Sequence, residues 1–337
     1  MLQTQDGFEF FVFFMQTPIV LLIGLLGNSL GLFVIWRKKF LKLGPREMYL
    51  SLFIIDSLIL ISTLNFYLSK AFEINFTIQS SLACKLFMYL EYSMAPVSSM
   101  LLVYILAERF LSIKYPVESN LLRNKNIQLI FLVVTIIFNM IYYLIVPFSY
   151  DVITYEYDIS FNTTTSHFNP NKTIDIGCYF VNASKKRIIS NLVIIHKIFL
   201  PVGLMILFSV LLIHSIFKSR SRVLILYSKR EINLFKSDVQ LSIMWILINL
   251  IFIGLNVPFA GVLLFYEDYS DLLFYFTLNL FYLSYAFNFY FFLLFNSMFR
   301  QEFISSFKSE PHPVHSTYTS SNDSFNLRLI KYSFYQN

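Results

Sequence analysis

The stretch CKLFMYLEYSMAPVSSMLLVYILAERF, Cys84–Phe110, is apolar along most of its length and ends in an acid and an arginine. As a helix that rises about 1.5 Å per residue, it covers about 37 Å from Cys84 to Arg109, which is one bilayer crossed at a slight tilt. Cys84 is therefore expected at one membrane face and Glu108-Arg109 at the other. Because an arginine at that depth is costly unless it is paired or reaches water, the sequence predicts a functional role for Arg109.

The whole chain has the composition of a membrane protein. Hydrophobic residues make up 56% of its 337 residues and charged residues only 14%. A soluble domain of this size could not bury so much apolar surface, whereas apolar runs of about 20 residues each cross a bilayer. We expect an all-α membrane protein, a seven-helix bundle with spans at about 11–36, 47–71, 82–115, 126–149, 190–217, 236–265 and 272–295.

The basic residues gather in three loops between these spans. The groups are Arg37, Lys38, Lys39, Lys42 and Arg46; Lys114, Arg123 and Lys125; and Lys218, Arg220, Arg222, Lys229 and Arg230, whereas the opposite loops carry more acids than bases, although their bases include Lys185, Lys186 and Arg187. The positive-inside rule makes all three loops cytoplasmic, so the N-terminus is expected outside the cell and the C-terminus inside. The net charge of +6 therefore indicates membrane topology rather than nucleic-acid binding.

Sequons for N-glycosylation support the same orientation. Four of them fall in segments predicted to lie outside the cell: Asn75, Asn162, Asn171 and Asn182. Cys84 and Cys178 are the only cysteines, and both are also expected on the outer side, where an oxidising compartment favours a disulfide. This bridge would tie the long, acidic and aromatic segment at about 150–189 to the third span. That segment is interpreted either as a lid that attracts a cationic ligand or as a glycosylated loop without ligand contact.

Short motifs recur in order along the spans. They are Gly27-Asn28, Asp56, Glu108-Arg109-Phe110 with Pro116, Pro201, Phe252 with Pro258, and Asn288-Phe289-Tyr-Phe-Phe292 followed by Asn296 and Phe299-Arg300. In their order and spacing these residues resemble the rhodopsin-like (class A) G-protein-coupled receptors, of an invertebrate orphan or peptide-receptor type, over most of residues 18–308. The resemblance divides the chain into an extracellular N-terminus at 1–10, a receptor domain at 11–295, a membrane-surface helix at 296–308 and a disordered cytoplasmic tail at 309–337.

The chain departs from the family pattern at several positions. Asn256 stands two residues before Pro258, where the family usually has a tryptophan that responds to ligand. Phe289 replaces a proline and Phe292 a tyrosine in the seventh span. Ser209 stands eight residues after Pro201, where a tyrosine is also usual. By resemblance, the two missing tyrosine hydroxyls affect activation more than the fold.

By the same resemblance, Arg109 is held at rest by Glu108 and by an acid at the cytoplasmic end of the sixth span, where Asp238 stands. Release of Arg109, next to Phe110, would accompany an outward movement of that helix, with Asn288 and Phe292 taking part in the switch. The alternative is a pair of interfacial charges in water, worth about 0–1 kcal/mol.

A carboxylate in the middle of the second span, Asp56, must face a polar interior. The resemblance places Ser98, Ser284 and Asn288 around it, in a cluster that commonly takes an allosteric sodium ion through oxygen ligands. A protonated, hydrogen-bonded Asp56 without an ion is the alternative. We expect no other cofactor and no further metal.

Glu91 lies two helical turns past Cys84, where amine receptors usually place an aspartate. A buried anion needs a cation or several donors. The partner is either a basic group of the ligand, with Tyr282 beside it, or one of His196 and Lys197 of the fifth span. Asn256 and Phe252 are expected to complete the ligand site.

The sequence therefore predicts a multi-pass plasma-membrane receptor that activates a heterotrimeric G protein, and not an enzyme, since no catalytic motif is present. The expected ligand is a peptide with a basic group, as for a neuropeptide receptor. A receptor kinase and arrestin are further expected partners, next to the lipid bilayer. A small-amine or chemosensory receptor is the alternative, and a transporter or channel would require repeats that the chain lacks.

Overall fold

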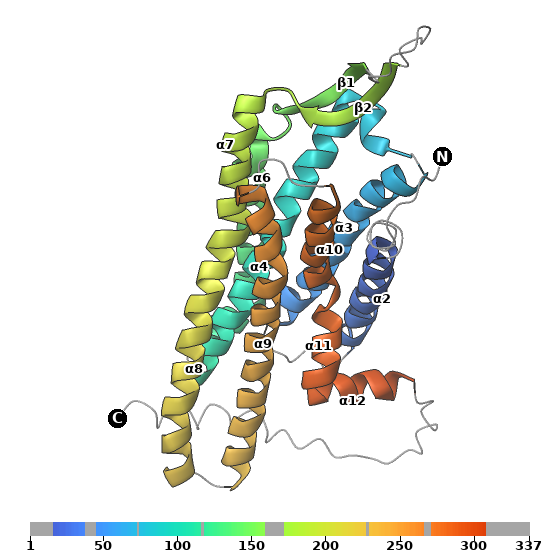
Figure 1. The fold of residues 1–337 in the computed structure, drawn as a ribbon. Helices are drawn as coiled ribbons and strands as arrows, with labels where there is room; N and C mark the ends of the chain where they lie inside the picture. The colour runs from blue at the N-terminus through green and yellow to red at the C-terminus, as the bar shows by residue number, and fades with distance from the viewer. Residues whose placement is uncertain are drawn as a thin grey trace.

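The apolar segments form one bundle of long helices in the computed structural model of the chain (Figure 1). The structure describes residues 16–37, 45–72, 74–115, 118–158, 172–226, 229–265 and 271–307. Within these ranges the side chains of a few stretches, including 220–226 and 229–238, also lie outside the description. Six single helices of the described part are long and apolar enough to cross a membrane, and a bent helix pair makes the seventh. The predicted seven-helix bundle is confirmed.

The elements follow the predicted spans closely. The first four spans are α2 (Thr17–Ile35), α3 (Arg46–Phe72), α4 (Ser81–Lys114) and α6 (Lys125–Tyr142). The fifth consists of α7 (Ala183–Ile194), the π-helix η5 (Ile195–Phe199) and α8 (Leu200–Leu226), the sixth is α9 (Lys229–Phe265), and the seventh is α10 (Asp271–Ala286) with α11 (Asn288–Phe295). Shorter helices are η3 (Phe76–Ile78), α5 (Ser119–Arg123), η4 (Tyr143–Ile145) and α12 (Ser297–Ser306).

The predicted boundaries of three spans differ from the observed helices. The fifth helix begins at Ala183 and ends at Leu226, instead of 190–217, and the sixth begins at Lys229 instead of 236. Lysine, arginine and glutamine are good helix formers, so a helix continues in water after its apolar stretch has left the bilayer. The fourth helix is shorter than expected, because Tyr143–Ile145 tightens into a 3-10 turn before the chain leaves the bundle.

The seventh span bends by 47° between α10 and α11, although phenylalanine replaces the family's proline at position 289. The bend lies beside Asn288, whose side chain donates a hydrogen bond to Asp56 of α3. A side-chain anchor to a neighbouring helix therefore marks the break that a proline marks elsewhere. Beyond α11, α12 turns across the end of the bundle (Figure 1).

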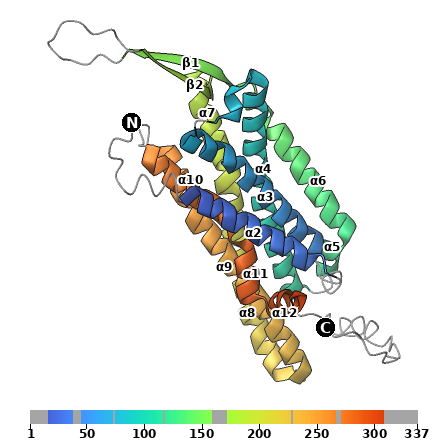
Figure 2. The ribbon, with the colours of Figure 1, turned by 90° about the vertical axis from the view of Figure 1, so that its right-hand side faces the viewer.

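The outer surface of the bundle is apolar, whereas its interior combines a large apolar core with buried polar side chains. α6 illustrates this: its buried side chains include Gln128, Thr135 and Asn139. Large apolar side chains cover its exposed face: Leu129, Ile130, Val133, Val134, Ile137, Phe138 and Ile141. Figure 2 shows α6 at the outer side of the bundle. A surface of this kind suits lipid, not water, as the solvent around the helices.

Small residues let the first helix approach its neighbours closely. A Cβ added to Gly24 would lie 2.8 Å from the Cβ of Ala286 and 2.4 Å from a methyl group of Leu60. Gly24 thus allows α2 to touch both α3 and α10, in the manner of small residues at helix interfaces in membranes.

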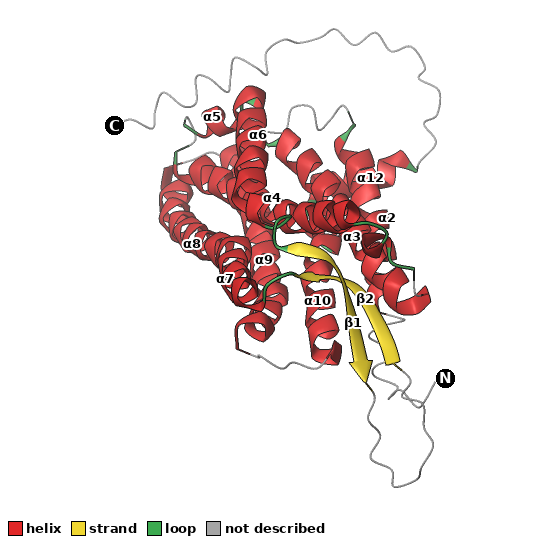
Figure 3. Ribbon diagram, turned by 90° about the horizontal axis from the view of Figure 1, so that it is seen from above, coloured by secondary structure: helices red, strands yellow, loops and turns green. Residues whose placement is uncertain are grey.

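The long segment after the fourth span contains a β-hairpin that the sequence did not predict. β1 (Tyr150–Asp158) pairs antiparallel with β2 (Lys172–Phe180), from Tyr150 opposite Phe180 to Asp158 opposite Lys172. Figure 3 shows the two strands side by side over the end of the helices. Both strands, YDVITYEYD and KTIDIGCYF, are rich in the β-branched and aromatic residues that favour strands, so a local signal for the hairpin was present in the sequence.

Three contacts fix the base of the hairpin to α4. The predicted disulfide between Cys84 and Cys178 is confirmed, with the two Cα atoms 5.6 Å apart. The ammonium of Lys85 lies 3.2 Å from a carboxylate oxygen of Asp151, and hydrogen bonds from Ser81 and Lys85 lower the pKa of the Asp151 carboxyl. The hydroxyls of Tyr92 and Tyr150 are 2.8 Å apart. This end of the bundle is called the disulfide end below, and the opposite one the Arg109 end.

Loss of the disulfide should destabilise the folded protein. The variants Cys84→Ser, Cys178→Ser and the double variant are expected to lower the melting temperature of the purified protein by the same several degrees, since each removes one bond worth about 2–5 kcal/mol. The measurement is thermal unfolding in detergent. Additive losses in the double variant would contradict a bond between these two cysteines.

Candidate functional site

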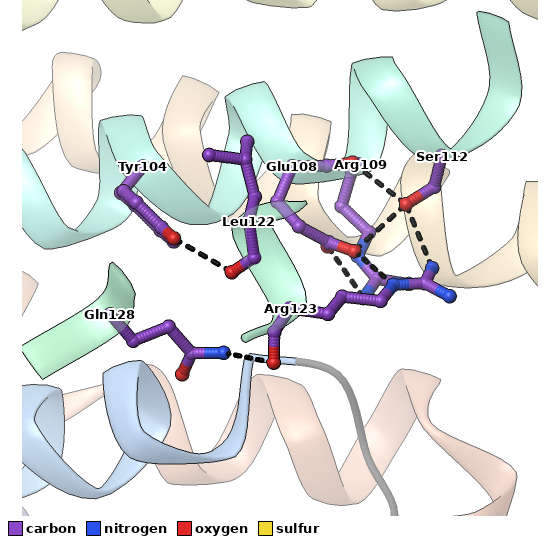
Figure 4. Close-up of polar contacts among 7 residues, drawn as sticks. All are labelled: Tyr104, Glu108, Arg109, Ser112, Leu122, Arg123 and Gln128. Carbon is purple, nitrogen blue, oxygen red and sulfur yellow. Dashed lines mark hydrogen bonds and ion pairs between the residues drawn. The ribbon is translucent and has the colours of Figure 1, made fainter. Parts of the chain in front are cut away.

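A cluster of ion pairs lies at the end of α4 that contains Arg109. Glu108 is 0% exposed and Arg109 5% exposed. One carboxylate oxygen of Glu108 (Oε2) lies 2.6 Å from the Arg109 guanidinium. Its other oxygen (Oε1) accepts a hydrogen bond of 2.7 Å from Nε of Arg123 (Figure 4). One buried carboxylate is thus shared by two cations, one on each oxygen.

The second cation comes from α5, a short helix that the sequence analysis treated only as part of a basic loop. Tyr104 of α4 donates a hydrogen bond of 2.7 Å to the carbonyl of Leu122, and Gln128 of α6 donates one of 3.0 Å to the carbonyl of Arg123. A terminal nitrogen of Arg123 also donates to the Ser112 hydroxyl over 2.8 Å. No pattern in the sequence predicts the pair of Glu108 and Arg123, because Arg123 lies outside the helical repeat that relates Glu108 to its neighbours in α4.

The other residues predicted for the switch lie around this cluster. Phe110 is buried and packs against Phe208, with ring centroids 6.3 Å apart. The side chain of Asp238 lies outside the described residues, so its predicted contact with Arg109 stays a prediction. In the described part of the chain, the acid that holds Arg109 is Glu108.

Phe292, which replaces the family's tyrosine, lies in an aromatic cluster of three helices. Its ring is 5.3 Å from both Tyr49 of α3 and Trp245 of α9, edge-on in each case. Tyr49 and Trp245 stack on each other at 5.6 Å. Neither Tyr49 nor Trp245 was predicted from the sequence as part of the switch. Tyr49, Trp245 and Phe292, called the aromatic trio below, join α3, α9 and α11 by ring packing. At Phe292 the family pattern would have a tyrosine hydroxyl.

Asp56 lies in the middle of the bundle and is 0% exposed. Ser98 of α4 donates a hydrogen bond to one of its oxygens, and Asn288 donates one of 2.6 Å to the other. Ser284, also predicted to join this cluster, instead donates to the carbonyl of Phe281 in its own helix over 2.7 Å. The Asp56 carboxylate and the Ser98 hydroxyl are hard oxygen donors of the kind that fit a sodium ion. Asn288 turns its N–H groups toward Asp56 and is a weaker fit as a ligand.

Toward the disulfide end, Glu91 and Tyr282 meet between α4 and α10. The Tyr282 hydroxyl donates a hydrogen bond of 2.8 Å to Oε1 of Glu91. The second oxygen of Glu91 (Oε2) is buried and has no hydrogen-bond partner among the described residues. A buried carboxylate oxygen in this condition can accept a further donor.

Lys197 of η5 lies within electrostatic reach of Glu91 and is 8% exposed. Its ammonium is 4.5 Å from the ring centroid of Phe281 and 5.7 Å from that of Tyr92. In the described part of the chain, no acceptor forms a hydrogen bond with it. The cluster of Glu91, Lys197, Tyr282 and their aromatic neighbours therefore holds an anion and a cation that are both incompletely satisfied.

His196 makes its contacts on the fourth span. Its Nδ1 is 3.0 Å from the Tyr143 hydroxyl, and its ring stacks on Tyr142 at 4.1 Å. It is therefore engaged away from Glu91, although the sequence alone offered it as a partner of that acid. His196 and Lys197 are consecutive residues of the π-helical turn η5 and so point in different directions, and such turns often occur at functional sites.

Asn256 and Phe252 lie one helical turn apart in α9. The amide of Asn256 donates a hydrogen bond of 2.7 Å to the carbonyl of Phe252, while its Oδ1 is buried without a partner in the described structure. The Phe252 ring meets Tyr285 of α10 edge-on at 6.2 Å. Both residues face the interior of the bundle and are 1% and 3% exposed.

The predicted glycosylation sites are only partly within the described residues. Asn162 and Asn171 lie outside them. Asn75 caps η3, where its side-chain oxygen accepts hydrogen bonds from the backbone N–H and the hydroxyl of Thr77. Asn182 is exposed between β2 and α7. Both are at the disulfide end, and their glycosylation stays a prediction.

The family model for seven-transmembrane receptors of the rhodopsin family matches residues 27–298. The chain belongs to this family. It is therefore a G-protein-coupled receptor with several membrane spans and an extracellular ligand. The matched range includes Asp56, Glu91, Arg109 and Asn288, the residues around which the clusters above are built. No curated protein matches the receptor in a sequence search.

The aromatic trio should contribute strongly to the stability of the receptor. Trp245 is 0% exposed, so Trp245→Ala is expected to cost about 3–5 kcal/mol of unfolding free energy through the cavity that it leaves. Trp36, the other tryptophan, is 72% exposed and provides the matched control. Trp36→Ala should change the unfolding free energy by less than about 0.5 kcal/mol. Thermal unfolding in detergent measures both, and equal losses would contradict the packing role of Trp245.

Proposed function

We propose that this receptor lies in the plasma membrane with its disulfide end outside the cell, binds a ligand that carries a basic group, and activates a heterotrimeric G protein at its Arg109 end. One observation carries the proposal. A single helix, α4, holds Glu91 with an unsatisfied carboxylate oxygen toward one end and the paired Glu108-Arg109 at the other. About 17 residues separate them, which is about 26 Å along a helix.

Charge supports the orientation. The basic loops predicted to be cytoplasmic adjoin the Arg109 end, and Arg46, Arg123 and Arg300 are described there. The sequons Asn75 and Asn182 lie at the opposite end, as does the disulfide, which needs an oxidising compartment. The N-terminus is then extracellular and the C-terminus cytoplasmic.

The chemistry of the Glu91 cluster supports the choice of ligand. A basic group would satisfy the free oxygen of Glu91, and Tyr282 would orient that carboxylate through its hydrogen bond. Lys197 would then need an acceptor of its own, because a ligand cation weakens its attraction to Glu91. A peptide with a basic side chain close to a carboxylate meets both demands. A small amine is the second candidate, favoured by the Glu91–Tyr282 hydrogen bond alone.

Activation is proposed as a population shift between two arrangements of the bundle. Pro258 in α9 lacks a backbone donor, so a bend forms there at little cost. Ligand contact near Asn256 and Phe252 would move the other end of α9 outward and separate Trp245 from Tyr49. Arg109 would then leave Glu108 and its predicted second partner Asp238, and meet the G protein.

Two additional parts of the proposal follow from the family. Asp56 and Ser98 would hold an allosteric sodium ion, which would favour the resting arrangement by neutralising a buried carboxylate. Serines and threonines after α11, among them Ser305 and Ser306, would accept phosphate from a receptor kinase and recruit arrestin.

The receptor function is tested through Arg109. Cells that express the receptor should activate a G protein when challenged with a pooled library of peptides and biogenic amines. Arg109→Ala should abolish this response without loss of surface expression or ligand binding, because the group that meets the G protein is missing. Signalling that persists in Arg109→Ala would contradict the mechanism.

The ligand chemistry is tested with peptides that end in arginine, each made as the free acid and as the C-terminal amide. Glu91→Gln should raise the concentration for half-maximal response at least about tenfold for both forms, which corresponds to about 1.4 kcal/mol. Lys197→Met should remove the preference for the free acid and leave the amide unaffected. An equal effect of Lys197→Met on the two forms would contradict an acceptor contact at Lys197.

A further inference from the structure

The feature that the proposed mechanism leaves unused is the second cation on Glu108. Arg109 occupies Oε2 of this carboxylate and Arg123 occupies Oε1, at 2.6 Å and 2.7 Å. The side chain of Glu108 is 0% exposed, that of Arg109 6% and that of Arg123 30%. Water therefore does not help to solvate the carboxylate, and its charge depends on the two guanidinium groups and on the hydroxyl of Ser112, 2.8 Å from Oε1.

Release of Arg109 creates an electrostatic problem at this site. A buried carboxylate that loses its only cation is strongly destabilised, because the desolvation of the charge is no longer compensated. If Glu108 had Arg109 alone, this penalty would oppose the release that activation requires. With Arg123 still in place on Oε1, the carboxylate remains paired after Arg109 has left.

The contacts that position Arg123 would remain when α9 moves. Its carbonyl accepts a hydrogen bond from Gln128 of α6, and the carbonyl before it accepts one from Tyr104 of α4. Its guanidinium is fixed by Glu108 and Ser112, both on α4 (Figure 4). All these partners belong to α4 and α6, and none belongs to the helix that moves.

We propose that Arg123 is the standing counter-ion of Glu108, which keeps this buried carboxylate paired when Arg109 leaves and thereby favours the active state of the receptor. The proposal rests on the proposed function, since it concerns the cost of releasing Arg109. It makes Arg123 a positioning residue that acts through Glu108 and not through contact with the G protein.

The opposite role would be that of a clamp on the resting state. If Arg123 mainly rigidified Glu108 so that Glu108 retained Arg109, removing Arg123 would raise signalling without ligand. The two roles therefore differ in the sign of one measured change. They also differ from a direct contact of Arg123 with the G protein, because such a contact would not depend on Glu108.

The experiment is a double-mutant cycle on the full-length receptor. Arg123→Gln, Glu108→Gln and the double variant are purified in lipid nanodiscs, and nucleotide exchange on a G protein is measured without ligand at increasing receptor concentration. Arg123→Gln should lower the exchange rate about tenfold relative to the unmodified receptor. In the Glu108→Gln background, where no carboxylate is left to be stranded, the same change should alter the rate less than twofold.

Two further variants control for charge and for folding. Lys125→Gln removes an exposed positive charge two residues away and should leave the exchange rate unchanged. Arg123→Lys keeps a cation near Glu108, although it cannot span Glu108 and Ser112 together, and should restore most of the rate. Melting temperatures of all variants show whether any of them is unfolded. If Arg123→Gln is unfolded, Arg123→Lys is compared with the unmodified receptor in its place.

Three results would overturn the proposal: a higher exchange rate in Arg123→Gln, an unchanged rate, or an equal loss with and without Glu108. The first indicates a clamp, the second an ion pair without consequence, and the third a direct role at the G-protein surface. Failure of the proposed function is recognised separately. In that case the Arg109→Ala receptor would give the same exchange rate as the unmodified receptor.

Discussion

A carboxylate that cannot reach water must be matched by positive charge or by donors, and Glu108, at the Arg109 end of α4, is under this constraint. It binds Arg109 of its own helix and Arg123 of α5, and through Arg123 it fixes the short helix between the third and fourth spans. The Glu108 charge holds the side chains of Arg109 and Arg123, while Tyr104 and Gln128 hold the same α5 segment through its backbone carbonyls.

The same constraint acts at two other depths of the bundle. Asp56 is satisfied by Ser98 and Asn288, which join α3 to α4 and α11. Glu91 is half satisfied by Tyr282, which joins α4 to α10. Each buried acid therefore connects helices that are distant in the sequence. These polar contacts add directional links to the apolar core that the same helices share, so a change in one of them can alter the arrangement of several helices together.

Aromatic packing takes over where the receptor departs from its family pattern. Phe292 lacks the hydroxyl of the usual tyrosine, yet its ring packs against Tyr49 and Trp245 and so joins three helices. Phe289 stands in place of a proline and packs against Phe299 and Phe303 of α12. The bend of the seventh span is retained without the proline, next to the Asn288 anchor. The proposed outward movement of α9 would have to separate Trp245 from this packing.

The sequence by itself determined the class of fold, the seven spans, the disulfide and the two ends of α4. These features depend on local quantities: the length of apolar runs, the number of cysteines and the spacing from Cys84 to Glu91 and Arg109. Only the tertiary structure decided which groups satisfy the buried charges. The pairing of Arg123 with Glu108, the hairpin beside Cys178 and the turn of His196 toward Tyr143 join segments that no helical repeat relates. Such contacts arise because each buried polar atom needs a partner, and the chain topology determines which partner is near.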